Sequence, residues 1–170
     1  MRIKWLAPLA ALVILAACES TPEDDAMTDS QATTGQADAS GAQAAVSETG
    51  IVPGSQEDLA QNVGDRVFFD FDSSVLSPRA RQTLEAQAAW LNRFPNVRFM
   101  IEGHCDERGT REYNLALGER RAAAAMNYLV ALGVDVSRLS TISYGKERPY
   151  ALGHDEDSWA QNRRGVSIVQ

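Results

Sequence analysis

The stretch from residue 97 to residue 132 constrains the fold most, because a strand pattern gives way to a helix pattern within it across one short polar loop. Val97, Phe99 and Ile101 recur at every second position, which is typical of a strand with one buried face. From residue 111 an alanine-rich stretch follows, whose apolar residues recur at helical spacing. The sequence therefore predicts a strand, a loop and a long helix in direct succession.

The rest of the C-terminal part repeats this alternation. Strands and helices following one another as βαβαβ predict an α/β domain, an α+β sandwich in which the helices pack on one sheet. The predicted strands are 67–71, 97–102, 139–144 and 165–169. The predicted helices run from Pro78, capped by Ser77, to about Phe94 and from Arg111 to Leu132, with a short helix near Trp159.

The same patterns predict which side chains are buried. In the first strand, Phe68 and Phe69 are assigned to the core. Arg163 and Arg164 precede the last strand, and they are expected to lie in solvent at its entry. In the second long helix, the expected buried stripe is Leu115, Ala122, Met126 and Leu129.

The loop and the first turns of this helix carry the candidate binding residues. Asp106 lies in the loop, while Asn114, Leu117 and Arg121 fall at positions i, i+3 and i+7 of the helix and share one face. A carboxylate and a guanidinium thus border one small concavity. Such a pair suits a zwitterion, with Asp106 holding an ammonium and Arg121 a carboxylate. The alternative is that Asp106 and Arg121 pair with each other as a structural ion pair.

Several separated motifs occur in a fixed order along the C-terminal part. They are FDFD at 69–72, GHCDERGTREYN at 103–114, LGERRA at 117–122, SYGKERP at 143–149 and NRRG at 162–165. Together they resemble the OmpA-like peptidoglycan-binding domain family, specifically its peptidoglycan-associated lipoproteins. Several motifs in order make a more specific match than one short pattern.

The resemblance covers about residues 65–170 and implies helices packed on a four-stranded mixed sheet. It also implies a ligand, the diaminopimelate residue of the peptidoglycan stem peptide, and it implies no cofactor and no catalysed reaction. One departure is Cys105, where the family usually has a small residue such as Ala or Thr. The ligand-binding residues implied by the resemblance are Phe71, Asp72, Asp106, Asn114, Leu117 and Arg121. The family regularly has the pair Arg163 and Arg164, so for these the resemblance implies a structural role without direct ligand contact as the alternative to solvent exposure.

The resemblance also implies protein partners. Domains of this family bind TolB and act with other Tol proteins in envelope integrity and cell division, through a surface that overlaps the peptidoglycan site. Two alternatives remain: a domain whose main role is binding TolB, and a peptidoglycan-modifying enzyme.

The N-terminal residues have the pattern of an export signal. Arg2 and Lys4 precede an apolar run that is too short to span a bilayer, and Leu15-Ala16-Ala17-Cys18 resembles a bacterial lipobox. We expect a signal peptide at 1–17, acyl chains on Cys18, and sorting to the outer membrane with the domain in the periplasm. The alternative is an ordinary secretory signal with an incidental cysteine.

Charge separates the next two segments. Residues 18–63 contain nine acidic residues and no Lys or Arg, whereas the residues from 64 onward contain 14 of each sign. We therefore expect a disordered acidic linker at 18–62 and a folded domain at 63–170. A neutral domain lacks the basic footprint of nucleic-acid binding.

His104 and Cys105 raise two further possibilities, a metal site and a thiol nucleophile. A zinc site needs three or four ligands, and the only other histidine is the distant His154. Adjacent residues of an extended segment point in opposite directions, so His104 is badly placed to activate Cys105. The preferred interpretation is that Cys105 packs as a small apolar residue and His104 makes structural hydrogen bonds.

Overall fold

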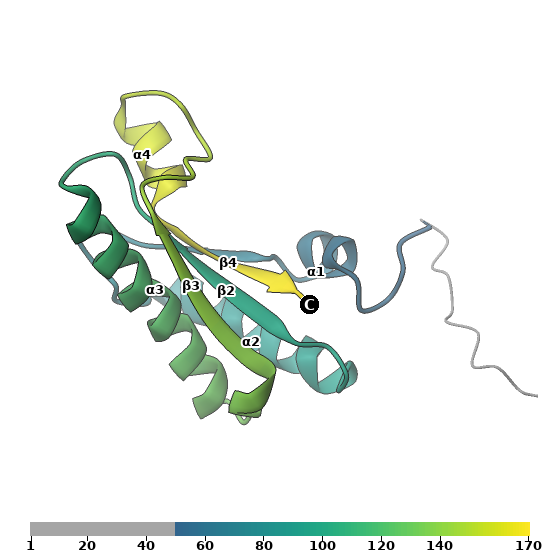
Figure 1. Ribbon diagram of the computed structural model, residues 1–170. Helices are drawn as coiled ribbons and strands as arrows, with labels where there is room; N and C mark the ends of the chain where they lie inside the picture. The colour runs from purple at the N-terminus through teal and green to yellow at the C-terminus, as the bar shows by residue number, and fades with distance from the viewer. Residues whose placement is uncertain (1–49) are drawn as a thin grey trace, which may run out of the picture. The chain divides into compact units, whose positions relative to one another are not determined.

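The computed structural model describes residues 50–170, drawn in colour in Figure 1. The predicted signal peptide, the lipidated Cys18 and the linker up to residue 49 lie outside the described residues. Within 50–170, no helix has the length and apolar character needed to cross a membrane.

Four strands form one sheet, in the order β1-β4-β2-β3. Strands β2 and β3 are parallel, and β4 runs antiparallel to both of its neighbours, β1 and β2. The predicted four-stranded mixed sheet is therefore confirmed. The elements in chain order are α1 (Gln56–Asn62), β1 (Arg66–Phe68), α2 (Pro78–Arg93), β2 (Phe99–His104), α3 (Arg111–Ala131), the 3₁₀ turn η1 (Val136–Arg138), β3 (Leu139–Gly145), α4 (Glu156–Asn162) and β4 (Arg164–Val169).

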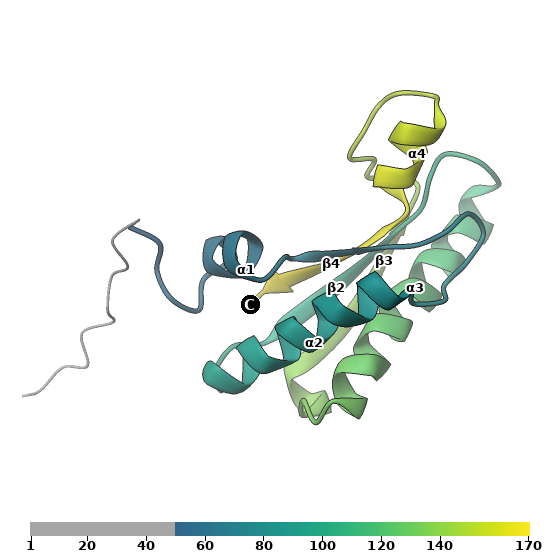
Figure 2. The ribbon, with the colours of Figure 1, turned by 180° about the vertical axis from the view of Figure 1, so that it is seen from behind.

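The long helices α2 and α3 share one apolar core with the sheet. Phe99 and Ile101 alternate along β2 and are each 1% exposed, packed among the apolar side chains of both helices. The ring of Trp90 on α2 stacks on that of Phe99, with 5.8 Å between centroids. Figure 2 shows α2 lying across the strands. Sheet and helices thus form two layers, as the alternation of elements predicted.

The start of α2 follows its sequence signals. The Ser77 side chain accepts a hydrogen bond from the backbone N–H of Ala80, and Pro78 occupies the first turn, where no N–H is needed. Phe68 was assigned wrongly: it is 45% exposed, because Val67 faces the core and its neighbour in the strand must face outward. Phe69, just after the strand, is buried as predicted.

The buried stripe of α3 also differs from the predicted one. Leu115 is 50% exposed, whereas Ala122 and Leu129 are fully buried. The rotation of the helix is set by Gly118, whose missing Cβ would lie 2.8 Å from the Gly103 carbonyl oxygen on β2. Arg121, three positions after Gly118, is fully buried, whereas Leu115, three positions before it, is half-exposed, so the buried stripe lies on the Arg121 side of Gly118.

Residues 56–62 were predicted to belong to the linker, and this is wrong. They form helix α1, capped by Ser55, whose side chain accepts a hydrogen bond from the backbone N–H of Asp58. Leu59 is fully buried in the core, and the Asp58 carboxylate accepts a hydrogen bond of 2.9 Å from the Trp90 indole. One buried leucine and one satisfied carboxylate therefore attach this acidic segment to the folded domain.

Candidate functional site

A cavity of about 160 Å³ opens where β2 ends and the chain turns toward α3. The structure brings all six predicted binding residues to this one cavity: Phe71, Asp72, Asp106, Asn114, Leu117 and Arg121. Four residues that were not predicted also line it: Cys105, Arg108, Gly109 and Tyr113. That these side chains bind a ligand stays a prediction.

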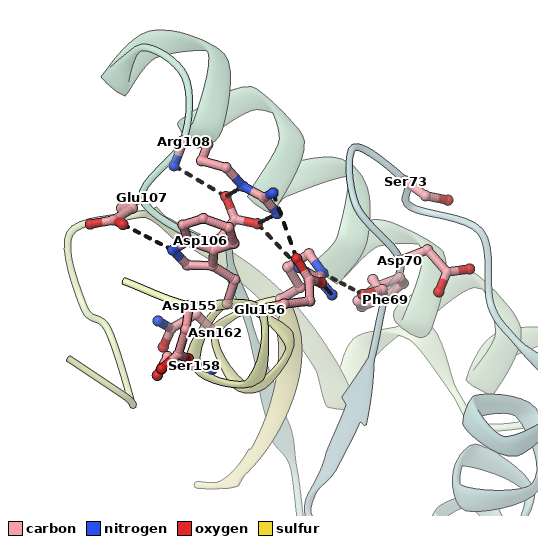
Figure 3. A network of polar contacts seen from close by, with 12 residues as sticks. Phe69, Asp70, Ser73, Asp106, Glu107, Arg108, Asp155, Glu156, Ser158 and Asn162 are labelled. Atoms are coloured by element: carbon pink, nitrogen blue, oxygen red, sulfur yellow. Dashed lines mark hydrogen bonds and ion pairs between the residues drawn. The ribbon is translucent and has the colours of Figure 1, made fainter. Parts of the chain in front are cut away.

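Asp106 is almost fully buried and is paired with two arginines. Its carboxylate accepts hydrogen bonds from Arg108 Nη2 at 2.7 Å and Nε at 3.3 Å, and from the Arg108 backbone N–H at 3.1 Å. Arg163 Nη1 lies 3.4 Å away. Figure 3 shows the Asp106 carboxylate against the Arg108 side chain. Burial by itself would raise the pKa of Asp106, but the hydrogen bonds and charge of Arg108 outweigh it, so this pKa lies below its usual value. The carboxylate is therefore negatively charged at neutral pH.

Arg121 is fully buried, and its guanidinium binds backbone rather than a carboxylate. Its nitrogens donate to the carbonyl oxygens of Ser73 and His104, each at 2.8 Å, and of Asp70 at 3.0 Å. In the part of the chain that the structure describes, Arg121 belongs to no ion pair, so its predicted alternative role as the partner of Asp106 is wrong. Burial lowers the pKa of this arginine.

The three hydrogen bonds of Arg121 do not use all of its N–H donors. A guanidinium has five N–H donors, and three carbonyl bonds leave two of them. Arg121 thus joins the loop after β1 to the end of β2 and forms the floor of the cavity. It contributes a buried positive charge that no carboxylate of residues 50–170 compensates by a direct bond.

Arg108 was not predicted as a site residue, yet it contacts Asp106, Phe71, Trp159 and Glu156 around the cavity. Its guanidinium carbon lies 4.0 Å from the centre of the Phe71 ring and 4.1 Å from that of the Trp159 ring. The edge of the same guanidinium donates hydrogen bonds to the Asp106 carboxylate. Glu156 on α4 lies 3.7 Å from Arg108 Nη1. The only sequence signal for this role was the position of Arg108, two residues after Asp106 in the same loop.

Arg163 and Arg164 are not solvated, contrary to the sequence prediction, and each is only 7% exposed. Arg163 donates to Glu156 at 2.7 Å and to the Phe69 carbonyl oxygen at 3.1 Å, besides its contact with Asp106. Acidic partners on two other segments allow this arginine to remain charged in the interior. Glu156 lies at the start of α4, the helix directly before Arg163 in the chain, whereas Asp106 comes from a distant segment that the local sequence could not reveal.

The remaining predicted residues form the rim and the helix side of the cavity. Phe71 is 59% exposed at the rim, and next to it Asp72 has a left-handed backbone with φ of 53°. The Tyr113 hydroxyl donates to the Asp72 carboxylate. Asn114 donates to the Arg108 carbonyl oxygen at 2.8 Å, and Leu117 is 5% exposed on the same helix face. Asn114 therefore fixes the loop that carries Asp106 and Arg108.

Cys105 is packed as predicted. It is 3% exposed, its thiol contacts the Asn114 carbonyl oxygen at 3.4 Å, and burial raises its pKa. His104 points elsewhere and places Nε2 3.3 Å from a Glu102 carboxylate oxygen. Within residues 50–170, no group of three or more His, Cys, Asp or Glu side chains is arranged to hold a metal ion.

The structure thus has two characteristic features, a two-layer α/β sandwich with the sheet order β1-β4-β2-β3 and a charged cavity at the end of β2. The OmpA family model matches residues 68–163, and the chain belongs to the OmpA family.

Known relatives narrow the comparison to one type of lipoprotein. The chain is 58% identical to the peptidoglycan-associated lipoprotein of Agrobacterium fabrum over 117 residues, which is 69% of this chain and 66% of that protein. It is 53% identical to that of Pseudomonas aeruginosa, over 68% of this chain and 69% of the relative. The predicted family resemblance is therefore confirmed.

Solved structures show the same likeness to peptidoglycan-associated lipoproteins and the same fold. The crystal structure of the peptidoglycan-associated lipoprotein from Burkholderia pseudomallei is 47% identical with a TM-score of 0.61, covering 62% of this chain and 90% of that one. The C-terminal domain of Helicobacter pylori MotB superposes with a TM-score of 0.59 at 23% identity, over 62% of this chain and 84% of that one. At that identity the likeness to MotB concerns the fold alone.

Proposed function

We propose that this domain binds the stem peptide of peptidoglycan without covalent chemistry, at the diaminopimelate residue. One observation carries the proposal: Arg121, a buried cation outside the ion pairs of the described residues, lines the same cavity as the ionised carboxylate of Asp106. A cavity with fixed charges of both signs suits a small zwitterionic group. The names of the relatives, peptidoglycan-associated lipoproteins, support peptidoglycan as the bound polymer.

The chemistry of diaminopimelate fits these charges. Its far end carries an ammonium and a carboxylate on one carbon atom. In the proposed complex Asp106 accepts hydrogen bonds from the ammonium, and the two remaining N–H groups of Arg121 donate to the carboxylate. Phe71 and Asp72 contact the ligand at the rim, and Asn114 and Leu117 form the helix side.

In the proposed domain arrangement, the binding domain is connected to a membrane anchor. Acyl chains on Cys18 anchor the protein in the outer membrane, and residues 19–55 join the anchor to the periplasmic domain. Each buried methylene contributes about 0.8 kcal/mol, so several chains give a lasting anchor. Binding to many stem peptides then holds the outer membrane to the cell wall, even where each contact has moderate affinity.

TolB and other Tol proteins are proposed as partners on the basis of the family resemblance, in the Tol-Pal system of envelope integrity and cell division. We propose no catalysed reaction. The thiol of Cys105 is buried with a raised pKa, and Asp106 has a lowered pKa, so neither suits the role of a nucleophile or an acid at neutral pH.

A sacculus pull-down tests the proposed ligand. Asp106→Asn keeps the shape of the side chain and removes its charge, so we expect at least about tenfold weaker binding to purified sacculi. Glu57→Gln, at an exposed position of α1, loses the same charge far along the chain and should bind like the parent. Parental binding by Asp106→Asn contradicts the site assignment, and soluble fragments released from the sacculi contradict a purely binding role.

A stem peptide with lysine in place of diaminopimelate separates the two charges. Lysine keeps the ammonium and lacks the second carboxylate. We expect the lysine peptide to bind about tenfold more weakly than the diaminopimelate peptide, since a hydrogen bond to a charged group contributes about 1.5–3 kcal/mol. Equal affinities for the two peptides contradict a role for Arg121 in ligand recognition.

A further inference from the structure

Asp106 is occupied in the free protein, and this limits how a ligand can reach it. The Arg108 guanidinium covers the carboxylate through two nitrogen atoms, and the Asp106 side chain is only 5% exposed. Arg163 holds the carboxylate from another direction. A ligand cation therefore cannot contact Asp106 until Arg108 moves.

The groups around Arg108 are those that proteins use to bind organic cations. Phe71 and Trp159 present their rings to the guanidinium at 4.0 and 4.1 Å, and Asp106 supplies the negative charge. Aromatic faces combined with a carboxylate recognise ammonium and guanidinium groups through the ring quadrupole and the charge. We call Phe71, Asp106 and Trp159 the cation cage.

Of the two arginines on Asp106, Arg108 is the one that can leave. Its side chain is 31% exposed, whereas that of Arg163 is 8% exposed and is also bound to Glu156 and to the backbone of Phe69. An arginine at the surface regains water when it leaves, so displacing it costs less than displacing a buried one. Arg163 therefore remains on Asp106 while Arg108 can be exchanged.

We propose that Arg108 is an internal, displaceable occupant of the cation cage, and that the ammonium group of the ligand takes its place. The identity of that ligand rests on the proposed function, whereas the existence of the cage does not. The displaced guanidinium moves outward toward Glu156, which already lies 3.7 Å from it. Binding then exchanges one cation for another at Asp106 and leaves no buried carboxylate unpaired.

The proposal gives Trp159 a binding role that the sequence did not indicate. Its indole N–H donates to Glu107 at 2.9 Å, and Glu107 in turn contacts His154 at 2.8 Å. Glu107 lies in the same loop as Asp106, so the Trp159 hydrogen bond holds α4 against the loop that carries these two acids, both labelled in Figure 3. Trp159 is thereby positioned as one wall of the cage.

The cage itself is tested without any peptidoglycan. Arg108→Ala empties it, and titration with methylguanidinium, followed through the NMR signal of the Trp159 indole N–H, should show saturable binding at about millimolar concentration. The parent protein, whose cage is filled, should show none, and so should the double variant Arg108→Ala with Asp106→Asn. Lack of saturable binding to Arg108→Ala, or equal binding to the parent, overturns the proposal.

Displacement is tested with the ligand of the proposed function. Calorimetric titration with the tripeptide L-Ala-γ-D-Glu-meso-diaminopimelate should show about three- to tenfold tighter binding to Arg108→Gln than to the parent, because no internal cation competes. Arg98→Gln, an exposed arginine just before β2, loses the same charge and should bind like the parent. Unchanged or weaker binding by Arg108→Gln overturns the displacement.

The two titrations test different claims, so either claim can be contradicted while the other stands. If methylguanidinium binds Arg108→Ala while the tripeptide binds none of the proteins, the cage stands and the proposed ligand is contradicted. If the tripeptide binds the parent and Arg108→Gln equally, and Asp106→Asn abolishes binding, the proposed ligand stands and the exchange of cations is contradicted.

Discussion

Two arginines at opposite ends of β2 make the same kind of contact in different surroundings. Arg121 donates to three carbonyl oxygens at the end of β2 and in the loop after β1. Arg138, in η1, donates to three carbonyl oxygens between the end of α2 and the start of β2, those of Leu91, Phe94 and Val97. Each arginine therefore joins several backbone carbonyl groups through one guanidinium.

The difference lies in what surrounds each guanidinium. Arg138 is half-buried and lies next to a corner closed by apolar side chains. Arg121 is fully buried at the floor of a cavity whose other charged groups are Asp72, Asp106 and Arg108. Hydrogen bonding to carbonyl groups is thus common to both arginines. What sets Arg121 apart is a cavity with the carboxylate of Asp106 beside it.

Gly103→Ala should have the largest effect, because the backbones of β2 and α3 are in direct contact at Gly103 and Gly118, next to the cavity. An added Cβ would lie 1.8 Å from the Gly118 carbonyl oxygen, so helix and strand must separate. We expect the free energy of unfolding to fall by about 4 kcal/mol or more, measured by urea denaturation. The control is Gly165→Ala, the residue paired with Gly103 on β4, where the nearest atom is 3.4 Å away and the loss should stay near 1 kcal/mol. Similar losses for the two variants contradict the close packing.

Arg121→Lys and Arg138→Lys compare the two arginines directly. A lysine keeps the charge and cannot reach three carbonyl groups at once, so Arg121→Lys should leave buried acceptors unpaired and lower the free energy of unfolding by about 3–4 kcal/mol. Arg138→Lys should cost about 1 kcal/mol, because water reaches its half-buried site.

Only the change at Arg121 should affect the ligand. We expect folded Arg121→Lys to bind the diaminopimelate tripeptide at least about tenfold more weakly than the parent, because the planar fork is lost. Arg138→Lys should bind like the parent. Near-parental affinity of Arg121→Lys indicates general attraction to a positive charge and removes the distinction between the two arginines.

Because of His104, we expect the free energy of unfolding of the domain to depend on pH. Burial, followed by the charges of Arg164 and Arg148, lowers its pKa to about 4, whereas an unfolded histidine titrates near 6.5. Between these values the unfolded chain binds a proton that the folded chain does not. The free energy of unfolding therefore decreases as the pH falls from about 6.5 to about 4, by up to about 3 kcal/mol, and this contribution is fully present above pH 6.5.

Urea denaturation at pH 4.5 and pH 7 measures this dependence. His104→Gln should lose most of the difference between the two pH values. His154→Gln, whose native side chain is 80% exposed, should keep it. Asp58 and Asp106 have lowered pKa values, so their stabilising contributions are present at both pH values and are lost only at more acidic pH. An unchanged difference in His104→Gln assigns the acid sensitivity to other groups.

Cys105→Ala should have the smallest effect. The thiol lies in the wall of the cavity but donates only a weak hydrogen bond to Asn114. We expect a loss of about 1 kcal/mol or less in the free energy of unfolding and unchanged binding to sacculi. Loss of binding in this folded variant would indicate that the thiol itself takes part in recognition.

The sequence predicted the features that depend on neighbouring residues. Ser77 and Pro78 fixed the start of α2, and the spacing of Asn114, Leu117 and Arg121 placed them on one buried face. These are local signals, read within two or three helical turns. The family motifs added the mixed sheet and the six residues around the cavity.

Contacts between distant segments could not be predicted from local patterns. Asp58 contacts Trp90 32 positions away, and this contact helps to attach an acidic segment that looked like linker. Arg163 contacts Asp106 57 positions away, which helps to explain why this arginine, expected in solvent, is buried. In each case a charged group is satisfied by a partner that only the folded chain brings near.

The structure of the domain bound to L-Ala-γ-D-Glu-meso-diaminopimelate tests the central claim most directly. We predict the ligand ammonium within hydrogen-bonding distance of Asp106 and its carboxylate at the guanidinium of Arg121, both inside the cavity at the end of β2. A tripeptide bound elsewhere on the domain, or held in the cavity with both charged groups in solvent, would contradict it.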